Sequence, residues 1–280
     1  MQVSFPKLGL EFTIERIAFH LFSLPIYWYG IIIAFGLVAG ILVSTLSAKK
    51  LGDNTDIPID LAIFCGPVSI VCARLYYVIF NFSYYFQNPI EIFNLRQGGI
   101  AIYGAVIGAV LSAYVYSRVK KYNSLRVFDI GSFGLITGQM IGRWGNFFNQ
   151  EAFGDNTNLP WGMISQNTVS HLNSLQSKGF DVDPLACVHP TFLYESVWCL
   201  GVLILMFVVF KKYRYNGQIF FLYAFLYGLG RFWIEGLRTD SLMLGSIRVS
   251  QALALISVFV FGFLYIYFLK KHRTNDAINN

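Results

Sequence analysis

The stretch IYWYGIIIAFGLVAGILVSTLSAKK, residues 26–50, decides the fold class. It carries no charged residue before its two terminal lysines, Lys49 and Lys50. A helix needs about 20 mainly apolar residues to cross the roughly 30 Å hydrocarbon core of a bilayer. The run is too long for a cleavable signal peptide, and no small-residue cleavage site follows it. We therefore expect it to form a membrane-spanning helix.

Six further apolar runs follow it, and the seven predicted spans cover residues 26–48, 57–80, 98–117, 126–148, 191–210, 217–237 and 247–269. Of the 280 residues, 55% are hydrophobic and 13% are charged. Soluble domains carry about 25% charged residues, so this composition excludes a soluble enzyme. It also excludes intrinsic disorder, which needs low hydrophobicity and high charge. We predict an all-α polytopic membrane protein with a single integral-membrane domain, residues 1–280.

The basic residues predict the orientation of the chain. The net charge of +6 does not indicate nucleic-acid binding, because most cations lie in short clusters between the apolar runs. Twelve fall on one side of the predicted membrane: Lys49, Lys50, Arg118, Lys120, Lys121, Arg126, Lys211, Lys212, Arg214, Lys270, Lys271 and Arg273. Six fall on the other: Lys7, Arg16, Arg96, Lys178, Arg238 and Arg248. The positive-inside rule places the N-terminus outside and the C-terminus in the cytoplasm.

One external segment, residues 149–190, is long, polar and rich in Asn, Asp, Ser and Gln. Long loops in compact folds are usually functional. The segment is either a functional part of the protein or a solvated cap over the helices.

Small residues recur at four-residue spacing on three predicted spans: Gly36 and Gly40, Gly104 and Gly108, and Gly134, Gly138 and Gly142. Such stripes let helices approach closely in lipid. They predict tight helix packing and do not identify a site.

Three arginines remain inside the predicted spans: Arg74, Arg143 and Arg231. A buried arginine in a membrane is costly and normally faces a partner or a cavity. With a rise of 1.5 Å per residue, the three lie about 27, 25 and 21 Å above the cytoplasmic edge, while Tyr103 lies about 10 Å below Arg96. Four spans are thus predicted to deliver polar groups to one outer layer of the membrane.

The chemistry of these side chains favours an anionic ligand. Arginine presents a planar fork of donors that matches a pair of phosphate oxygens, so the layer predicts a phospholipid headgroup site. Arg231 and Glu235 are four residues apart and can pair on one helix face, and the alternative is that this pair only fixes helix packing. Asn146 shares the face of Arg143 one turn later.

No motif of a serine or zinc protease or of a nucleotide-binding enzyme occurs in the chain. The four cysteines, Cys65, Cys72, Cys187 and Cys199, have neither zinc-site nor CxxC spacing. No metal or organic cofactor is expected. The alternative function is a secondary transporter or flippase for an anionic lipid or solute. We see no repeated halves and no charges near the midplane, which transporters often show.

The segment GRWGNFFNQEAFG, Gly142–Gly154, resembles the signature of the bacterial prolipoprotein diacylglyceryl transferases. Five more segments match that family in order: LPIYWYG (Leu24–Gly30), ARLYYVIFN (Ala73–Asn81), RQGGIAIYGAVIGA (Arg96–Ala109), HPTFLYES (His189–Ser196) and YGLGRFWIEGLRTD (Tyr227–Asp240). The resemblance covers about residues 20–270.

The resemblance implies transfer of the diacylglyceryl group of phosphatidylglycerol to the lipobox cysteine of a prolipoprotein, with formation of a thioether and release of glycerol phosphate. It implies a seven-span protein of the bacterial cytoplasmic membrane with an active site toward the outer leaflet. Its partners would be phosphatidylglycerol, prolipoprotein signal peptides and the bilayer, with no nucleic acid. By motif position, Arg143 and Arg231 match the family's two essential arginines, Asn146, Glu151 and Gly154 complete the signature, and Glu235, Tyr29 and Tyr227 match other important positions. The predicted catalytic residues are Arg143, Arg231, Tyr103 and Glu235. The predicted substrate-binding residues are Arg143, Asn146, Glu151, Gly154, Tyr29, Tyr227, Gln97, Arg74 and His189.

One position departs from the family pattern. Many members have a histidine where this chain has Tyr103, so an imidazole base there cannot be required of this protein. A tyrosine hydroxyl has an unperturbed pKa of about 10 and would act as a base only if that pKa were shifted. The identity of the general base stays open, and the candidates are Tyr103, Glu151, Glu235 and His189.

Overall fold

The computed structural model of the chain describes residues 1–95, 98–239, 243–245 and 247–278. It divides into two compact units. One unit contains Met1–Gly40 and Leu135–Asn280, and the other contains Ile41–Gly134. The boundary between the units falls inside two helices, α1 (Trp28–Leu51) and α5 (Ser124–Asn149). The first part of α1 and the last part of α5 belong to the first unit, and the rest of both helices belongs to the second.

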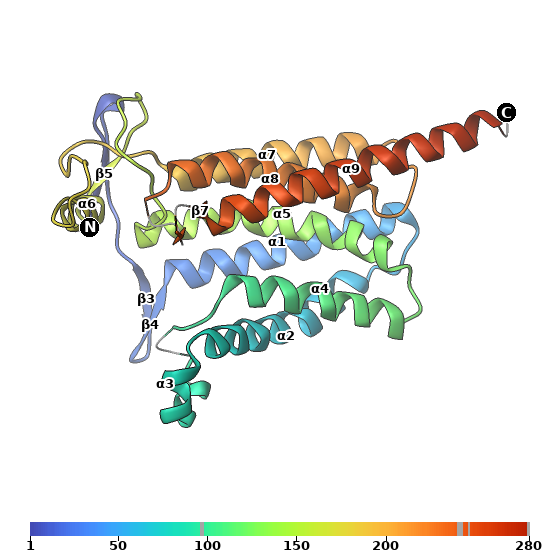
Figure 1. Ribbon diagram of the computed structural model, residues 1–280, viewed down its shortest axis with the longest axis horizontal. Helices are drawn as coiled ribbons and strands as arrows, with labels where there is room; N and C mark the ends of the chain where they lie inside the picture. The colour runs from blue at the N-terminus through green and yellow to red at the C-terminus, as the bar shows by residue number, and fades with distance from the viewer. Residues whose placement is uncertain (96–97, 240–242, 246, 279–280) are drawn as a thin grey trace. The chain divides into compact units, whose positions relative to one another are not determined.

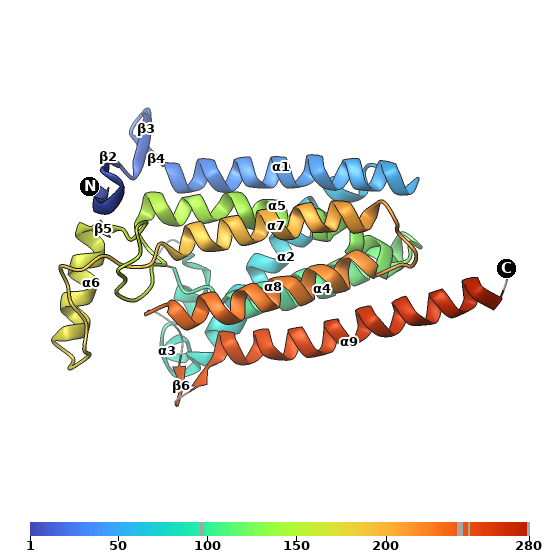
Figure 2. The ribbon, with the colours of Figure 1, turned by 90° about the horizontal axis from the view of Figure 1, so that it is seen from above.

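The first unit is built on helices α7 (Thr191–Phe210), α8 (Gln218–Leu237) and α9 (Val249–Ile278), which run side by side in Figures 1 and 2. The Ser257 hydroxyl of α9 donates to the Ala224 carbonyl of α8 over 2.9 Å. A Cβ at Gly228 would lie 3.0 Å from the Ala254 carbonyl oxygen, so glycine lets α8 and α9 approach closely.

The glycine stripes mark helix contacts in both units, as predicted. In the first unit a Cβ at Gly36 of α1 would lie 3.4 Å from the Gly138 carbonyl oxygen of α5. The second unit contains α2 (Ile57–Phe80) and α4 (Ile102–Val119), together with α3 (Phe82–Gln87) and the 3₁₀ helix η2 (Pro89–Phe93). There a Cβ at Gly104 of α4 would lie 2.6 Å from Tyr76 Cβ of α2. These helices therefore pack backbone against backbone.

Five helices of the described chain are long and apolar enough to cross a membrane: α1, α2, α4, α7 and residues 249–272 of α9. They indicate a membrane protein. Helices also form over the other two predicted spans, as α5 and α8. These two are not among the five because their sequences carry more polar residues, including Arg143 in α5 and Arg231 with Glu235 in α8.

The prediction of an all-α protein is wrong in one respect, because short strands flank the helices. Strands β2 (Leu10–Thr13), β1 (Gln2–Phe5) and β5 (Ile164–Ser165) form an antiparallel sheet in that order. The 3₁₀ helix η1 (Pro6–Leu8) joins β1 to β2. Two hairpins pair β3 (Ile17–Leu21) with β4 (Leu24–Tyr27), and β6 (Met243–Leu244) with β7 (Ile247–Arg248). The protein is mostly helical with small peripheral sheets.

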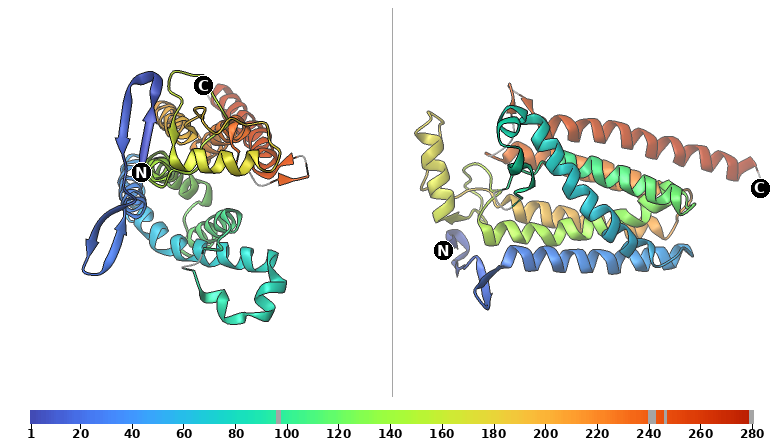
Figure 3. Two further views of the ribbon diagram at one scale, coloured as in Figure 1. Left: turned by 90° about the vertical axis from the view of Figure 1, so that its left-hand side faces the viewer. Right: turned by 90° about the horizontal axis from the view of Figure 1, so that it is seen from below.

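The polar segment 149–190 is folded and is called the head segment below. It contains β5 and helix α6 (Gln166–Gln176), whose N-terminus has a capping box between Ser165 and Thr168. With the N-terminal strands it encloses a small core of Val3, Phe5, Ile14, Phe153, Met163, Leu172, Val188 and Phe192. Figure 3 shows β1 and β2 beside α6. The head segment is therefore more than a solvated loop, since it holds buried apolar side chains.

Candidate active site

The centre of the candidate site is Glu195, near the start of α7, whose side chain is only 4% exposed. Its Oε2 lies 2.6 Å from Nη2 of Arg143, and its Oε1 lies 3.1 Å from Nη1 of Arg231. Nη1 of Arg238, the residue after α8, lies 3.7 Å from Oε1. One buried carboxylate thus contacts three guanidinium groups, and its negative charge offsets part of the cost of burying these cations.

A second carboxylate fixes the other edge of Arg231. Glu235 lies one turn further along α8, is 2% exposed and forms an ion pair with Arg231 Nη2. The predicted pairing of Arg231 with Glu235 is confirmed. Because Arg231 contacts a carboxylate on each side, its guanidinium plane is held in one orientation.

Aromatic hydroxyls surround the arginine pair. Tyr227 lies one turn before Arg231 on α8. Its ring stacks on Tyr223 at a centroid distance of 5.7 Å. The Tyr223 hydroxyl donates to Oε1 of Gln139 on α5 over 3.1 Å. Tyr227 therefore lies one helical turn from Arg231, and its role in substrate binding stays a prediction.

The arginines are not sealed off. The side chains of Arg143 and Arg231 are 19% and 22% exposed, whereas both carboxylates are almost inaccessible. The two arginine side chains are therefore partly accessible, whereas the carboxylates that hold them are not. An oxyanion that approaches this layer would meet preoriented N–H donors.

The signature segment turns sharply after α5. Asn146 Nδ2 donates to Oε1 of Glu151 over 2.9 Å, and Asn149 Nδ2 donates to the same oxygen over 3.3 Å. The Glu151 backbone N–H donates to the Asn146 carbonyl over 3.1 Å. Asn146 and Glu151 thus close the turn reciprocally and fix the path of the chain from α5 into the head segment.

Gly154 occupies a position that has no room for a side chain. A Cβ there would lie 2.8 Å from His189 Cβ, 2.9 Å from the Leu237 carbonyl oxygen and 3.1 Å from Thr191 Cγ2. The Gly154 N–H donates to the His189 carbonyl over 2.8 Å, and the Asp155 N–H donates to the Leu237 carbonyl over 2.8 Å. Glycine therefore lets the head segment attach directly to the end of α8 and the start of α7.

Tyr29, at the start of α1, packs on the signature helix. A Cβ at Gly145 of α5 would lie 2.8 Å from the Tyr29 ring. Tyr29 also lines a cavity of about 650 Å³ that reaches Asn149 and includes Pro25 and Ala34. The structure thus places Tyr29 beside the signature segment.

His189 belongs to a hydrogen-bonded chain at the base of the head segment. Its Nδ1 lies 3.1 Å from the Tyr194 hydroxyl, which accepts a hydrogen bond of 2.8 Å from Trp161 Nε1. Burial lowers the pKa of His189, while the negative charge of Asp155 acts in the opposite direction. The imidazole is therefore neutral at pH 7.

Arg74 of α2 lies in the second unit, and its five N–H donors meet five backbone carbonyls. Nε donates to the Ile92 carbonyl, and Nη1 donates to the carbonyls of Gly98 and Gly99. Nη2 donates to the backbone carbonyls of Glu91 and Asn94. The side chain is 6% exposed, and its guanidinium lies 5.0 Å from the centroid of the Tyr85 ring. These contacts give Arg74 a structural role, since it orders the chain between α3 and α4.

Tyr103 also lies in the second unit, on the first turn of α4, where its ring centroid is 6.4 Å from that of Tyr76. Gln97, another predicted substrate-binding residue, lies outside the described residues. In the described part of the chain, no group of three or more His, Cys, Asp or Glu side chains is arranged to hold a metal ion.

Sequence reasoning missed two residues of the cluster. Glu195 was not singled out although it is a lone acid within an apolar run, which is the signal that should have identified it. Arg238 was counted among the external cations, and its contact with Glu195 was not foreseen.

Comparison with known proteins agrees with the motifs. The family model for prolipoprotein diacylglyceryl transferase matches residues 16–267. A Clostridioides difficile protein named phosphatidylglycerol–prolipoprotein diacylglyceryl transferase is 45% identical over 261 residues, which are 93% of this chain and 98% of the relative. Relatives of the same name from Bacillus cytotoxicus and Clostridium novyi are 41% and 46% identical, over 96% and 86% of this chain and 97% and 91% of their own lengths. The chain therefore belongs to the prolipoprotein diacylglyceryl transferase family.

Proposed function

We propose that this chain transfers the diacylglyceryl group of phosphatidylglycerol to the lipobox cysteine of prolipoproteins. The observation that carries the proposal is the buried carboxylate of Glu195, which holds Arg143 and Arg231 together while both arginine side chains stay partly exposed. Two such forks match the oxygens of a phosphodiester. The names of the relatives supply the donor and acceptor classes.

In the proposed reaction the cysteine sulfur attacks the glyceryl carbon that carries the phosphate. A C–S bond forms, the C–O bond to the phosphate breaks, and the electron pair leaves on glycerol phosphate. Arg143 and Arg231 bind the phosphate and stabilise the negative charge that develops on the leaving group. The proton of the cysteine thiol passes to a base.

The candidate bases differ in their surroundings. Glu235 is almost inaccessible and engaged by Arg231, which argues against it as the proton acceptor. Glu151 is exposed, and His189 has an imidazole that is neutral at pH 7. Tyr103 would need its pKa lowered to act as a base, and as a hydrogen-bond donor it needs no such shift.

We further propose that α5 and α8 complete a seven-span topology with the N-terminus outside and the C-terminus in the cytoplasm. The 20 residues of α8 rise about 30 Å, enough to cross the hydrocarbon core. Arg143 of α5 and Arg231 of α8 both pair with Glu195 of α7, which lowers the cost of burying them. Reporter fusions after Lys50, Lys121 and Lys212 should all report a cytoplasmic location.

The proposed function is tested with purified protein, phosphatidylglycerol and a synthetic lipobox peptide. We expect the peptide to gain the mass of one diacylglyceryl group, and a peptide with serine in place of cysteine to gain none. Arg143→Ala should abolish the product, whereas Arg118→Ala, at an exposed arginine at the end of α4, should leave it unchanged. Movement of lipid across the bilayer without a covalent product would instead favour a flippase.

A further inference from the structure

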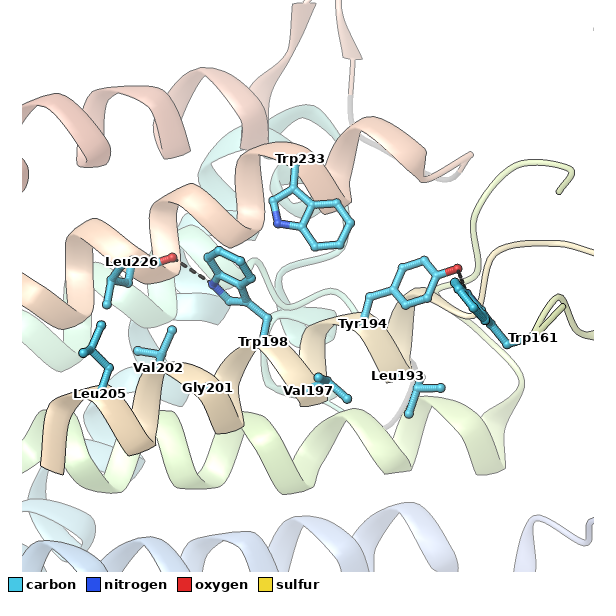
Figure 4. Close-up of a pocket in the computed structure, with 10 residues that line it drawn as sticks. All are labelled: Trp161, Leu193, Tyr194, Val197, Trp198, Gly201, Val202, Leu205, Leu226 and Trp233. Carbon is cyan, nitrogen blue, oxygen red and sulfur yellow. Dashed lines mark hydrogen bonds between the residues drawn. The ribbon is translucent and has the colours of Figure 1, made fainter. Parts of the chain in front are cut away.

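A deep apolar groove lies between α7 and α8, outside the arginine cluster. Figure 4 shows its walls: Leu193, Val197 and Leu205 come from α7, and Leu226 and Trp233 come from α8. Its volume is about 510 Å³, within the roughly 300–1,000 Å³ typical of small-molecule sites. None of the reaction steps proposed above uses it.

The groove has a fixed shape because aromatic side chains brace it. Trp198 of α7 reaches across to α8, where its Nε1 donates to the Leu226 carbonyl over 2.9 Å. The absence of a side chain at Gly230 makes room for this indole, which a Cβ there would overlap. The Trp233 ring stacks on Tyr194 at 6.1 Å and meets Trp198 edge-on at 6.1 Å.

The dimensions of the groove favour a single hydrocarbon chain. Leu193 and Leu205, which both line it, are separated along α7 by about 18 Å, which is close to half of the roughly 30 Å hydrocarbon core. Along α7 the groove therefore extends over about the thickness of one membrane leaflet, which is the span of an acyl chain in the bilayer.

The outer end of the groove lies at the level of the arginine cluster. Tyr194 precedes Glu195 in α7, and Trp233 follows Arg231 by two residues in α8, a rise of about 3 Å. Only at this end does the groove meet the head segment, through Trp161. A lipid with its phosphate on the arginines would therefore have its glycerol at the mouth of the groove.

We propose that the groove between α7 and α8 binds one acyl chain of the phosphatidylglycerol donor, and that it positions the glyceryl group against Arg143 and Arg231. This inference rests on the proposed function, because that function identifies the lipid. The groove aligns the donor through its tail, and the arginines hold it through its phosphate.

Gly201 provides a direct test. It lines the groove, and a Cβ there would meet no atom within 4 Å, so a side chain at position 201 can start into the groove and Gly201→Phe is expected to fill part of it. Gly66→Phe is the matched control, because Gly66 lies on α2 and its Cβ would likewise meet no atom within 4 Å. For long-chain phosphatidylglycerol we expect Gly201→Phe to reduce kcat/KM about tenfold, the effect of displacing roughly two buried methylene groups.

The same variant should transfer a short-chain phosphatidylglycerol as well as the unmodified protein does, because short tails do not reach Gly201. Gly66→Phe should match the unmodified protein with both lipids. Equal activity of Gly201→Phe and the unmodified protein with long-chain lipid would overturn the proposal. A rise in the KM of the peptide instead of the lipid would assign the groove to the prolipoprotein and also overturn it.

Fluorescence tests binding without catalysis. Three of the five tryptophans of the chain, Trp161, Trp198 and Trp233, line the groove. At equal low mole fraction, phosphatidylglycerol with brominated chains should quench tryptophan fluorescence more than brominated phosphatidylcholine does, and Gly201→Phe should remove the difference. Equal quenching by both lipids would show contact with bulk lipid only and overturn the proposal. If the unmodified protein binds brominated phosphatidylglycerol selectively but makes no lipidated peptide, the proposed function is wrong, whereas binding of an acyl chain in the groove is supported.

Discussion

Oε2 of Glu195 lies 2.6 Å from Nη2 of Arg143, so a buried acid on α7 orients a predicted catalytic arginine on α5. The same carboxylate also contacts Arg231 and Arg238. An arginine alone would have many rotamers, whereas one clamped by a carboxylate presents its remaining N–H groups in fixed directions. Glu195 therefore prepares the site before any substrate arrives.

The first prediction concerns Glu195→Gln, which keeps the shape of the side chain and removes its charge. Breaking a buried ion pair costs about 3–5 kcal/mol because the arginines lose their counterion. We expect a clear fall in the melting temperature in detergent and a transfer rate reduced about hundredfold, as when an oriented donor is lost. Glu11→Gln, at an exposed acid of β2, is the control and should change neither. An unchanged melting temperature for Glu195→Gln would contradict the buried cluster.

The second prediction separates charge from geometry at Arg143. Arg143→Lys keeps the positive charge but loses the planar fork of donors. We expect transfer to fall about 10²–10³-fold, the range for loss of one preorganised donor. Arg118→Lys should behave as the unmodified protein does. Transfer above one tenth of the normal rate in Arg143→Lys would mean that charge alone suffices.

Hydropathy predicted much of the helical architecture because it acts locally along the chain. The spans predicted at 126–148 and 217–237 form helices Ser124–Asn149 and Gln218–Leu237. The N-terminal strands escaped prediction because β1 is completed by β5, far away in sequence, and no local pattern encodes that partner. Similarly, the pair of Arg231 with Glu235 follows from helical spacing, whereas the contact of Glu195 with Arg143 depends on how two helices pack.

The third prediction concerns Gly154→Ala. The added methyl group would overlap His189 Cβ and the Leu237 carbonyl oxygen, so either the head segment or the end of α8 must move. Overpacking of this kind costs about 1–3 kcal/mol. We expect a lower melting temperature and loss of most transfer activity. Gly66→Ala, whose Cβ would meet no atom within 4 Å, is the matched control. A fully active and stable Gly154→Ala would show that the attachment of the head segment is not needed.

The fourth prediction concerns pH. Burial lowers the pKa of His189 in the folded protein, whereas the unfolded chain titrates at about 6.5. Above that pH His189 is neutral in both states and has no effect. As the pH falls below about 6.5, His189 takes up a proton in the unfolded state but not in the folded state, so the free energy of unfolding decreases. The difference in melting temperature between pH 7.5 and 5.5 should be smaller for His189→Gln, and unchanged for His20→Gln, at an exposed histidine of β3. Equal pH dependence in all three proteins would exclude His189 as the titrating group.

The last prediction distinguishes two roles for Arg74. If it binds the lipid headgroup, Arg74→Lys should raise the KM for phosphatidylglycerol and leave the melting temperature unchanged. The five carbonyls around its guanidinium predict the opposite, because the three N–H donors of lysine cannot satisfy them all. Each buried acceptor that loses its partner costs about 1–3 kcal/mol. We therefore expect a lower melting temperature with the KM for lipid unchanged, and Arg118→Lys should alter neither quantity. If Arg74→Lys instead raises the KM for phosphatidylglycerol and leaves the melting temperature unchanged, Arg74 binds the lipid headgroup.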